Sequence, residues 1–145
     1  MPANTIAEFL GGQTVFDKVI DSDLGLALEV ERGFPSAALA HVIHGVGGAI
    51  TQFDLYAVVG NARTLQRKRR NGARLSRDES DRLARLGRIH ERAVEALGTA
   101  EKAHRWLARP NRALDGVPPI KILGSDAGAV VVEQILGRIE HGVVG

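Results

Sequence analysis

Residues 51–72, TQFDLYAVVGNARTLQRKRRNG, contain the pattern that decides the fold. Thr51 and Asp54 stand three positions apart ahead of an apolar run, which is typical of a capped helix N-terminus. A tight turn at Gly60-Asn61 ends this helix, and a second helix is expected from residue 62 to about residue 70. Two short helices joined by a tight turn predict a helix-turn-helix.

The second helix of this pair is strongly basic. Arginine and glutamine can read guanine and adenine edges bidentately in a major groove, and Thr64 and Lys68 suit phosphates. Leu65 is the expected inward anchor, whereas Tyr56 stands where this motif usually has a small residue. A solvated cationic face is the alternative interpretation of such a charge run. The candidate DNA-binding residues are Arg63, Thr64, Gln66, Arg67, Arg69 and Arg70.

The distribution of charge favours the DNA-binding interpretation. The chain has 145 residues and a formal net charge of only +2. Residues 1–60 hold two basic and seven acidic side chains, residues 61–92 hold eleven basic and four acidic ones, and residues 93–145 hold six of each. A near-neutral total therefore conceals one basic block, and local positive charge of this kind makes phosphate a candidate ligand.

The remaining segments also predict helices. A capping sequence at Ser76–Glu79 opens a long amphipathic helix over about residues 77–97. Shorter helices are expected around Leu24–Val30, over residues 37–44, after residue 99 as far as Pro110, and from about residue 125 to Gly142. The spacing of Leu24 and Leu28 gives the first of these one apolar face. Only residues 117–123 offer a strand as an alternative.

These elements predict an all-α helical bundle. We expect a flexible N-terminal arm over residues 1–20, because Gly11-Gly12 interrupts a segment without clear period. A helix-turn-helix domain is expected over residues 21–75. A connecting helix and a C-terminal helical domain are expected over residues 76–145.

No arrangement of residues supports catalysis. The chain lacks cysteine, which excludes disulfides, thiolate metal sites and cysteine nucleophiles. His41 and His44 lack a third ligand, and His90-Glu91 is not followed by the second histidine of a zinc-protease motif. Residues 45–50 resemble a dinucleotide fingerprint but lack its last glycine and its preceding strand. We therefore expect no enzyme, no metal and no cofactor. No apolar run is long enough to span a bilayer, and the N-terminus lacks signal-peptide features, so we expect a cytoplasmic protein without a membrane partner.

The last helix is more apolar than one buried face requires. Its apolar residues cover more than one side, which indicates burial against a partner, although a central core helix would have the same composition. These residues are Val130, Val131, Val132, Ile135, Leu136 and Ile139.

From about residue 30 to the end, the sequence resembles the Xre/MbcA/ParS family, the antitoxins of RES-type toxin–antitoxin modules. The most specific stretch is Trp106-Leu107, Pro110-Asn111 and Leu114, followed by Pro118-Pro119 and a final glycine-containing helix. Further matching stretches are residues 33–39, 63–67, 75–76, 79–83, 103–107 and 140–142. Asp115-Gly116 replaces the usual Gly-Gly, and Lys121 stands where an acid is common.

This resemblance implies an Xre-like helix-turn-helix domain and a C-terminal toxin-binding domain. It implies a RES-domain toxin that consumes NAD or transfers ADP-ribose, and an antitoxin whose C-terminal segment covers the NAD pocket. It also implies a homodimer that binds operator DNA and represses its own operon. By matching position, the toxin-binding residues are Ile135, Arg138, Ile139, Glu140, His141, Val143 and Val144.

Three hypotheses follow. The first is a type II antitoxin, in which deletion of residues 136–145 abolishes neutralisation but leaves a folded dimer. The second is a stand-alone transcriptional repressor whose C-terminal half only dimerises. In the third, the basic face of the motif no longer binds DNA.

Overall fold

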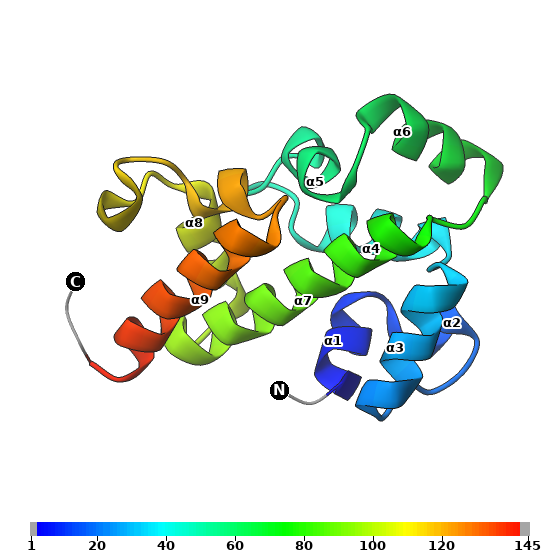
Figure 1. Ribbon diagram of the computed structural model, residues 1–145, viewed down its shortest axis with the longest axis horizontal. Helices are drawn as coiled ribbons and strands as arrows, with labels where there is room; N and C mark the ends of the chain where they lie inside the picture. The colour runs from blue at the N-terminus through cyan, green and yellow to red at the C-terminus, as the bar shows by residue number, and fades with distance from the viewer. Residues whose placement is uncertain (1–2, 143–145) are drawn as a thin grey trace.

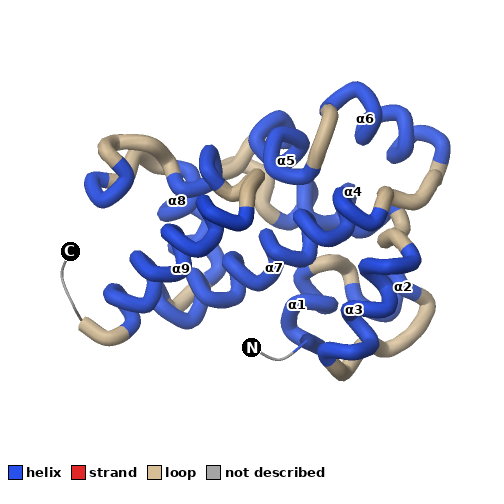
Figure 2. Tube along the Cα trace, viewed as in Figure 1, coloured by secondary structure: helices blue, strands red, loops and turns tan. Residues whose placement is uncertain are grey.

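The computed structural model describes residues 3–142, and this part of the chain is entirely helical, as predicted. The α-helices are α1 (Ala3–Phe9), α2 (Gly12–Phe16), α3 (Asp23–Arg32), α4 (Ser36–Gly45), α5 (Gln52–Val59), α6 (Ala62–Asn71), α7 (Arg77–Leu97), α8 (Ala100–Ala108) and α9 (Asp126–Glu140). Two short 3₁₀ helices, η1 (Arg112–Leu114) and η2 (Pro119–Ile122), lie between α8 and α9. Figure 2 shows that loops join the helices and that no strand is drawn.

Helix α7 is the central element of the molecule. It contacts α1, α3 and α5 as well as α8 and α9, so it links both halves of the chain (Figure 1). Its 21 residues span about 31 Å at the usual helical rise. The side chains of Leu83, Leu86 and Ile89 are buried along it. One continuous core therefore runs across the expected boundary at residues 75–76.

The N-terminal segment is ordered rather than the flexible arm that we expected. Residues 3–16 form α1 and α2, and Ile6, Leu10 and Phe16 are buried in the common core. Helix α1 packs on α7, where a Cβ at Gly87 would lie 3.0 Å from Ile6 Cγ2. The Phe9 ring also stacks on His90, with 4.1 Å between ring centroids. Burial of this apolar surface holds the segment in place despite its two glycines.

Helix α3 presents the opposite face to that predicted. Leu24 and Leu28 are 68% and 58% exposed, whereas Leu26 and Val30 pack against the core. The buried side of the helix also carries the Glu29 carboxylate, which accepts a hydrogen bond from Lys18 Nζ at 3.1 Å. Leu24 and Leu28 are four residues apart, and so are Leu26 and Val30. Either pair could form the buried side of a helix, so the apolar pattern alone could not select the buried face.

The segment that could have been a strand instead forms η2. Pro119 lies at its start, and Ile120 and Leu123 are buried, with η2 contacting α5 and α8. Helix α9 then packs very closely against the end of η2, since a Cβ at Gly128 would lie 1.7 Å from the Ile122 carbonyl oxygen. Only glycine fits at this crossing, which fixes how α9 enters the fold.

Candidate nucleic-acid interface and partner-binding surface

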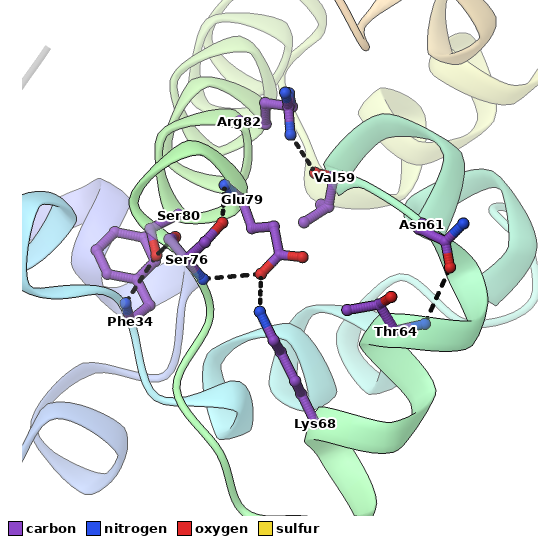
Figure 3. Close-up of polar contacts among 9 residues, drawn as sticks. All are labelled: Phe34, Val59, Asn61, Thr64, Lys68, Ser76, Glu79, Ser80 and Arg82. Atoms are coloured by element: carbon purple, nitrogen blue, oxygen red, sulfur yellow. Dashed lines mark hydrogen bonds and ion pairs between the residues drawn. The ribbon is translucent and has the colours of Figure 1, made fainter.

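Helices α5 and α6 are two short helices joined by a tight turn, as the sequence predicted. Thr51 Oγ1 accepts a hydrogen bond from the Asp54 N–H at 3.1 Å, which caps α5. Asn61 Oδ1 accepts one from the Thr64 N–H at 3.0 Å, which caps α6 two residues after α5 ends (Figure 3). Leu65 is fully buried, as expected of an inward anchor. Local capping therefore sets both helix starts and makes the turn tight.

The exposed side of α6 carries a stripe of arginines. Arg63, Arg67 and Arg70 are exposed and follow one another at intervals of four and three residues, which places them on one helix face. None of the three forms an ion pair within residues 3–142. Thr64 and Gln66 beside them are half-buried. Unneutralised guanidinium groups on a protruding helix suit the phosphates and base edges of a duplex.

Lys68 of α6 forms contacts within the fold. Lys68 Nζ donates a 2.6 Å hydrogen bond to Glu79 Oε1, and the same oxygen accepts from the Ser76 N–H at 2.7 Å (Figure 3). Glu79 thereby completes the capping box of α7, as the sequence predicted, and also holds α6. Burial raises the pKa of Glu79, but the hydrogen bonds from Lys68 and Ser76 outweigh it and leave this pKa below its ordinary value. Lys68 is therefore occupied by Glu79 and not free to bind phosphate as we expected.

Arg69 is also partly committed within the protein. Its Nη1 donates a 2.6 Å hydrogen bond to the Tyr56 hydroxyl, and the Tyr56 ring is fully buried between the helices. This bond explains how a large residue is accommodated where a small one is usual. Of the six candidate DNA-binding residues, the three of the arginine stripe are therefore the most accessible.

The predicted toxin-binding residues divide between core and surface. Ile135 is only 4% exposed and packs in the core, and Ile139 is half-buried. Glu140 Oε1 lies 3.4 Å from Arg92 Nη1 and is paired with it. Arg138 and His141 are exposed. Val143 and Val144 lie outside the described residues.

The valines that α9 exposes belong to the apolar excess noted in the sequence, but they are not among the predicted toxin-binding residues. Val130 and Val131 are 45% and 39% exposed, and Gln134 is exposed one turn further along. Gln134, Gly137, Arg138 and His141 line a shallow cavity of about 520 Å³. We refer to Val130, Val131, Gln134, Arg138 and His141 as the α9 face. Three consecutive valines give no sequence signal for which of them is buried, so the burial of Val132 in the structure identifies this face.

Two of the histidines, buried His90 and half-buried His104, form a pair. His90 Nε2 and His104 Nε2 are 2.9 Å apart, and burial followed by repulsion from His104 lowers the pKa of His90 to about 4. His41 and His44 are exposed. Within residues 3–142, no three histidine, aspartate or glutamate side chains come together as metal ligands would. Nor is any helix there long and apolar enough to cross a membrane.

Helix-turn-helix geometry, an arginine stripe and an exposed face on the last helix together define a helical protein with two potential interaction surfaces. Residues 92–142 match the family model described as the antitoxin Xre/MbcA/ParS C-terminal toxin-binding domain. The curated relatives include a protein of Pseudomonas putida named antitoxin Xre, which is 31% identical over 83% of this chain and 74% of its own length. This chain belongs to the Xre antitoxin family.

Two further relatives carry the same name. Antitoxin Xre of Photorhabdus laumondii is 37% identical over 63% of this chain and 63% of its own length. Antitoxin Xre of Yersinia enterocolitica is 36% identical over 57% of this chain and 56% of its own length. The chain thus spans somewhat less than two thirds of these two relatives.

Proposed function

We propose that this protein is a type II antitoxin that neutralises an NAD-consuming or ADP-ribosylating RES-domain toxin. In this proposal, the C-terminal segment covers the NAD pocket of the toxin, and the protein itself catalyses no reaction. The observation that carries the proposal is that the matched toxin-binding domain and the exposed α9 face lie in the same part of the chain. The residues that match a toxin-binding domain, 92–142, are also those that include the exposed α9 face.

The chemistry of the α9 face suits such a contact. Val130 and Val131 supply exposed apolar surface, and burial of that surface against a partner is favourable. Arg138 and His141 follow at the C-terminal end of the helix. Because Arg92 already holds Glu140, we assign to Arg138, which only donates hydrogen bonds, the contacts with acceptor groups that otherwise bind the ribose of NAD.

A truncation tests this proposal if it spares the fold. Deletion of residues 136–145 would remove Leu136, which is fully buried, and would also break the Arg92–Glu140 pair. Deletion of residues 141–145 begins after α9 ends and leaves both in place. Co-expressed with the toxin encoded beside it, this shorter chain should fold but fail to restore growth. Full protection by the truncated chain would refute occlusion by the C-terminal segment.

We further propose that α6 binds operator DNA and represses the operon. The arginine stripe supports this role because its charges are unpaired and exposed. Replacement of Arg63 and Arg67 by alanine should lower operator affinity and reduce the dependence of binding on salt by about one counterion per lost phosphate contact. Toxin neutralisation should persist in this variant. Unchanged operator binding would indicate that the stripe is a solvated face.

A stand-alone repressor is the competing function. It requires operator binding without any toxin partner, so the two functions differ in whether the R63A/R67A variant still protects cells from the toxin. Loss of operator binding together with retained protection supports the antitoxin. Operator binding by the wild-type chain without any protection supports the repressor.

Operator binding by a helix-turn-helix generally requires a dimer, and we place the homodimer contact on α3. Leu24, Ala27, Leu28 and Glu31 follow one another along its outward face. Antiparallel pairing of two such helices about a two-fold axis would bring Asp23 of one copy near Arg32 of the other, and both side chains are exposed. Apolar contact and opposite charges therefore favour a second copy as the occupant.

Sedimentation analysis tests this interface. Substitution of both Leu24 and Leu28 by lysine should produce a monomer with an unchanged helical content. Phe53→Lys is the matched control, because Phe53 is a similarly exposed apolar side chain on another helix. A dimer that survives the leucine substitutions would exclude α3 as the interface.

A further inference from the structure

A cavity lies beside the arginine stripe. Its volume is about 680 Å³, and residues of α4, α5 and α6 line it. Arg69 and Arg70 contribute the charged lining, and Gln52, Tyr56 and Gln66 contribute polar groups. No aspartate or glutamate is among the lining residues. The cavity therefore combines positive charge with neutral hydrogen-bond donors.

Arg69 has a donor that the protein does not satisfy. Its Nη1 is bonded to the Tyr56 hydroxyl at 2.6 Å, but its Nε is buried without a hydrogen-bond partner within the structure. An unsatisfied buried donor on a charged group is unfavourable, and binding of an anion to the same guanidinium would offset part of that cost. Tyr56 fixes the orientation of the guanidinium while leaving the group its full charge. Arg69 is thus held in position beside a cavity with nothing to neutralise it.

The remaining lining adds donors suited to an anion. Ser36 and Ala37 line the cavity at the start of α4, and the N-cap residue Pro35 provides no side-chain cap. Backbone N–H groups at a helix start carry partial positive charge. Two guanidinium groups can donate paired hydrogen bonds to the oxygens of a phosphate. A cation or an apolar ligand has no acceptor atoms to receive these bonds. The volume is also larger than a single phosphate group needs.

We propose that this cavity is a binding site for a phosphate group, held chiefly by Arg69 and Arg70. The phosphate belongs either to the backbone of bound DNA or to a free phosphate ester such as a nucleotide. Since Arg70 also belongs to the exposed stripe of α6, occupation by a free phosphate ester would reduce the affinity of this helix for a duplex. The site depends on the lining residues alone and stands whether or not the protein neutralises a toxin.

Nuclear magnetic resonance can observe the unsatisfied donor directly. Inorganic phosphate is titrated into the full chain at constant ionic strength, with sodium chloride as the balancing salt, while the Arg69 Nε–H signal is followed. We expect a saturable shift of this signal and of the Gln66 side-chain amide. A shift no larger than that produced by chloride would overturn the proposal.

Two matched variants separate a site from a general charge effect. Arg70→Gln should weaken phosphate binding at least about tenfold, because it removes one of two charged ligands. Arg63→Gln removes the same charge from the same helix but does not line the cavity, so binding should change less than about twofold. Equal weakening by both variants would refute the site. Retained helical content by circular dichroism confirms that each variant is folded.

A final pair of titrations identifies the source of the phosphate. If operator DNA supplies it, a saturating duplex should shift the Arg69 signal in the same direction and prevent any further shift by inorganic phosphate. If a free ester supplies it, adenosine monophosphate should bind more tightly than phosphate and should displace the duplex. A duplex that binds without affecting the signal, combined with no response to either phosphate compound, contradicts both sources.

Discussion

The Lys68–Glu79 pair should be a major determinant of how α6 is held on α7. We predict that Glu79→Gln destabilises the protein by about 3 kcal/mol. Loss of a hydrogen bond to a charged group costs about 1.5–3 kcal/mol, and removal of one partner from a buried ion pair costs about 3–5 kcal/mol. Because the Lys68 side chain retains 19% exposure, water relieves part of that penalty, and a value near the middle is expected.

A double-mutant cycle isolates this pair. Lys68→Met and Glu79→Gln together remove both charges, so neither charge remains buried without a partner, and the double variant should be more stable than Glu79→Gln alone. A coupling free energy of about 2 kcal/mol is expected. Urea denaturation of the four proteins, followed by far-ultraviolet circular dichroism, gives each free energy of unfolding. A loss below about 1 kcal/mol for Glu79→Gln, or strict additivity in the cycle, would refute the assigned role.

The same pair has a defined dependence on pH. The folded protein lowers the pKa of Glu79 below its ordinary value of 4.5, so the carboxylate stabilises the fold above that pH. This contribution is lost as the pH falls through the lowered pKa. The Glu79→Gln variant should therefore lose less stability than the wild-type protein on acidification below about pH 4.5.

Two further predictions concern the interior. Burial and His104 lower the pKa of His90 from 6.5 to about 4, so the stability of the fold should decrease by roughly 3 kcal/mol as the pH falls from 6.5 to about 4. In denaturation measured across that range, His90→Phe should remove most of this dependence on pH. An unchanged dependence on pH in the variant would contradict the assignment to His90. Gly128→Ala should destabilise by about 3 kcal/mol or more because its Cβ would overlap the Ile122 carbonyl. Gly137→Ala in the same helix should be neutral or stabilise by about 0.5–1 kcal/mol, because a Cβ there would lie 3.5 Å from Arg92 Nη2, an ordinary contact distance. Thermal unfolding that ranks the two glycine variants equally would reject this account of the α9 crossing.

Local signals were sufficient to predict much of the helical framework. The caps predicted at Thr51 and Ser76 are set by residues three positions apart, and each forms the expected hydrogen bond. Asn61 caps α6 through the same spacing, although the sequence pattern predicted it only as part of the turn. Leu65 is buried for an equally local reason, since it is the one large apolar residue of a basic helix. Elements defined by near neighbours in sequence were therefore predictable without tertiary information.

Long-range packing decided what the sequence could not predict. The order in residues 3–16 depends on α7, more than sixty positions away, which receives Ile6 and stacks His90 on Phe9. The rotation of α3 depends on a buried Glu29 paired with Lys18, and glutamate is rarely buried. These contacts leave no periodic trace, so composition and apolar spacing favoured the wrong interpretation in both places.

The candidate sites were predicted at the level of the helix and not of the individual side chain. Helix α6 was identified by its charge, but its pattern could not show that Lys68 turns to Glu79 while Arg67 remains exposed. Helix α9 was identified by its apolar excess, but three consecutive valines gave no direction until Val132 was found in the core. The exposed side of each helix is determined by the elements that pack against its other side, and the sequence pattern does not show those elements.

Binding of the proposed toxin partner to the α9 face is the most direct test of the proposed function. Isothermal titration calorimetry should compare the wild-type protein with a variant carrying Val130→Asp and Val131→Asp, and with the control Phe53→Asp. We predict a loss of about 3 kcal/mol for the valine variant, or roughly a hundredfold in Kd, from the apolar surface of two side chains. The control should bind like the wild-type protein. Wild-type affinity in a folded valine variant would contradict the assignment of the α9 face to the toxin.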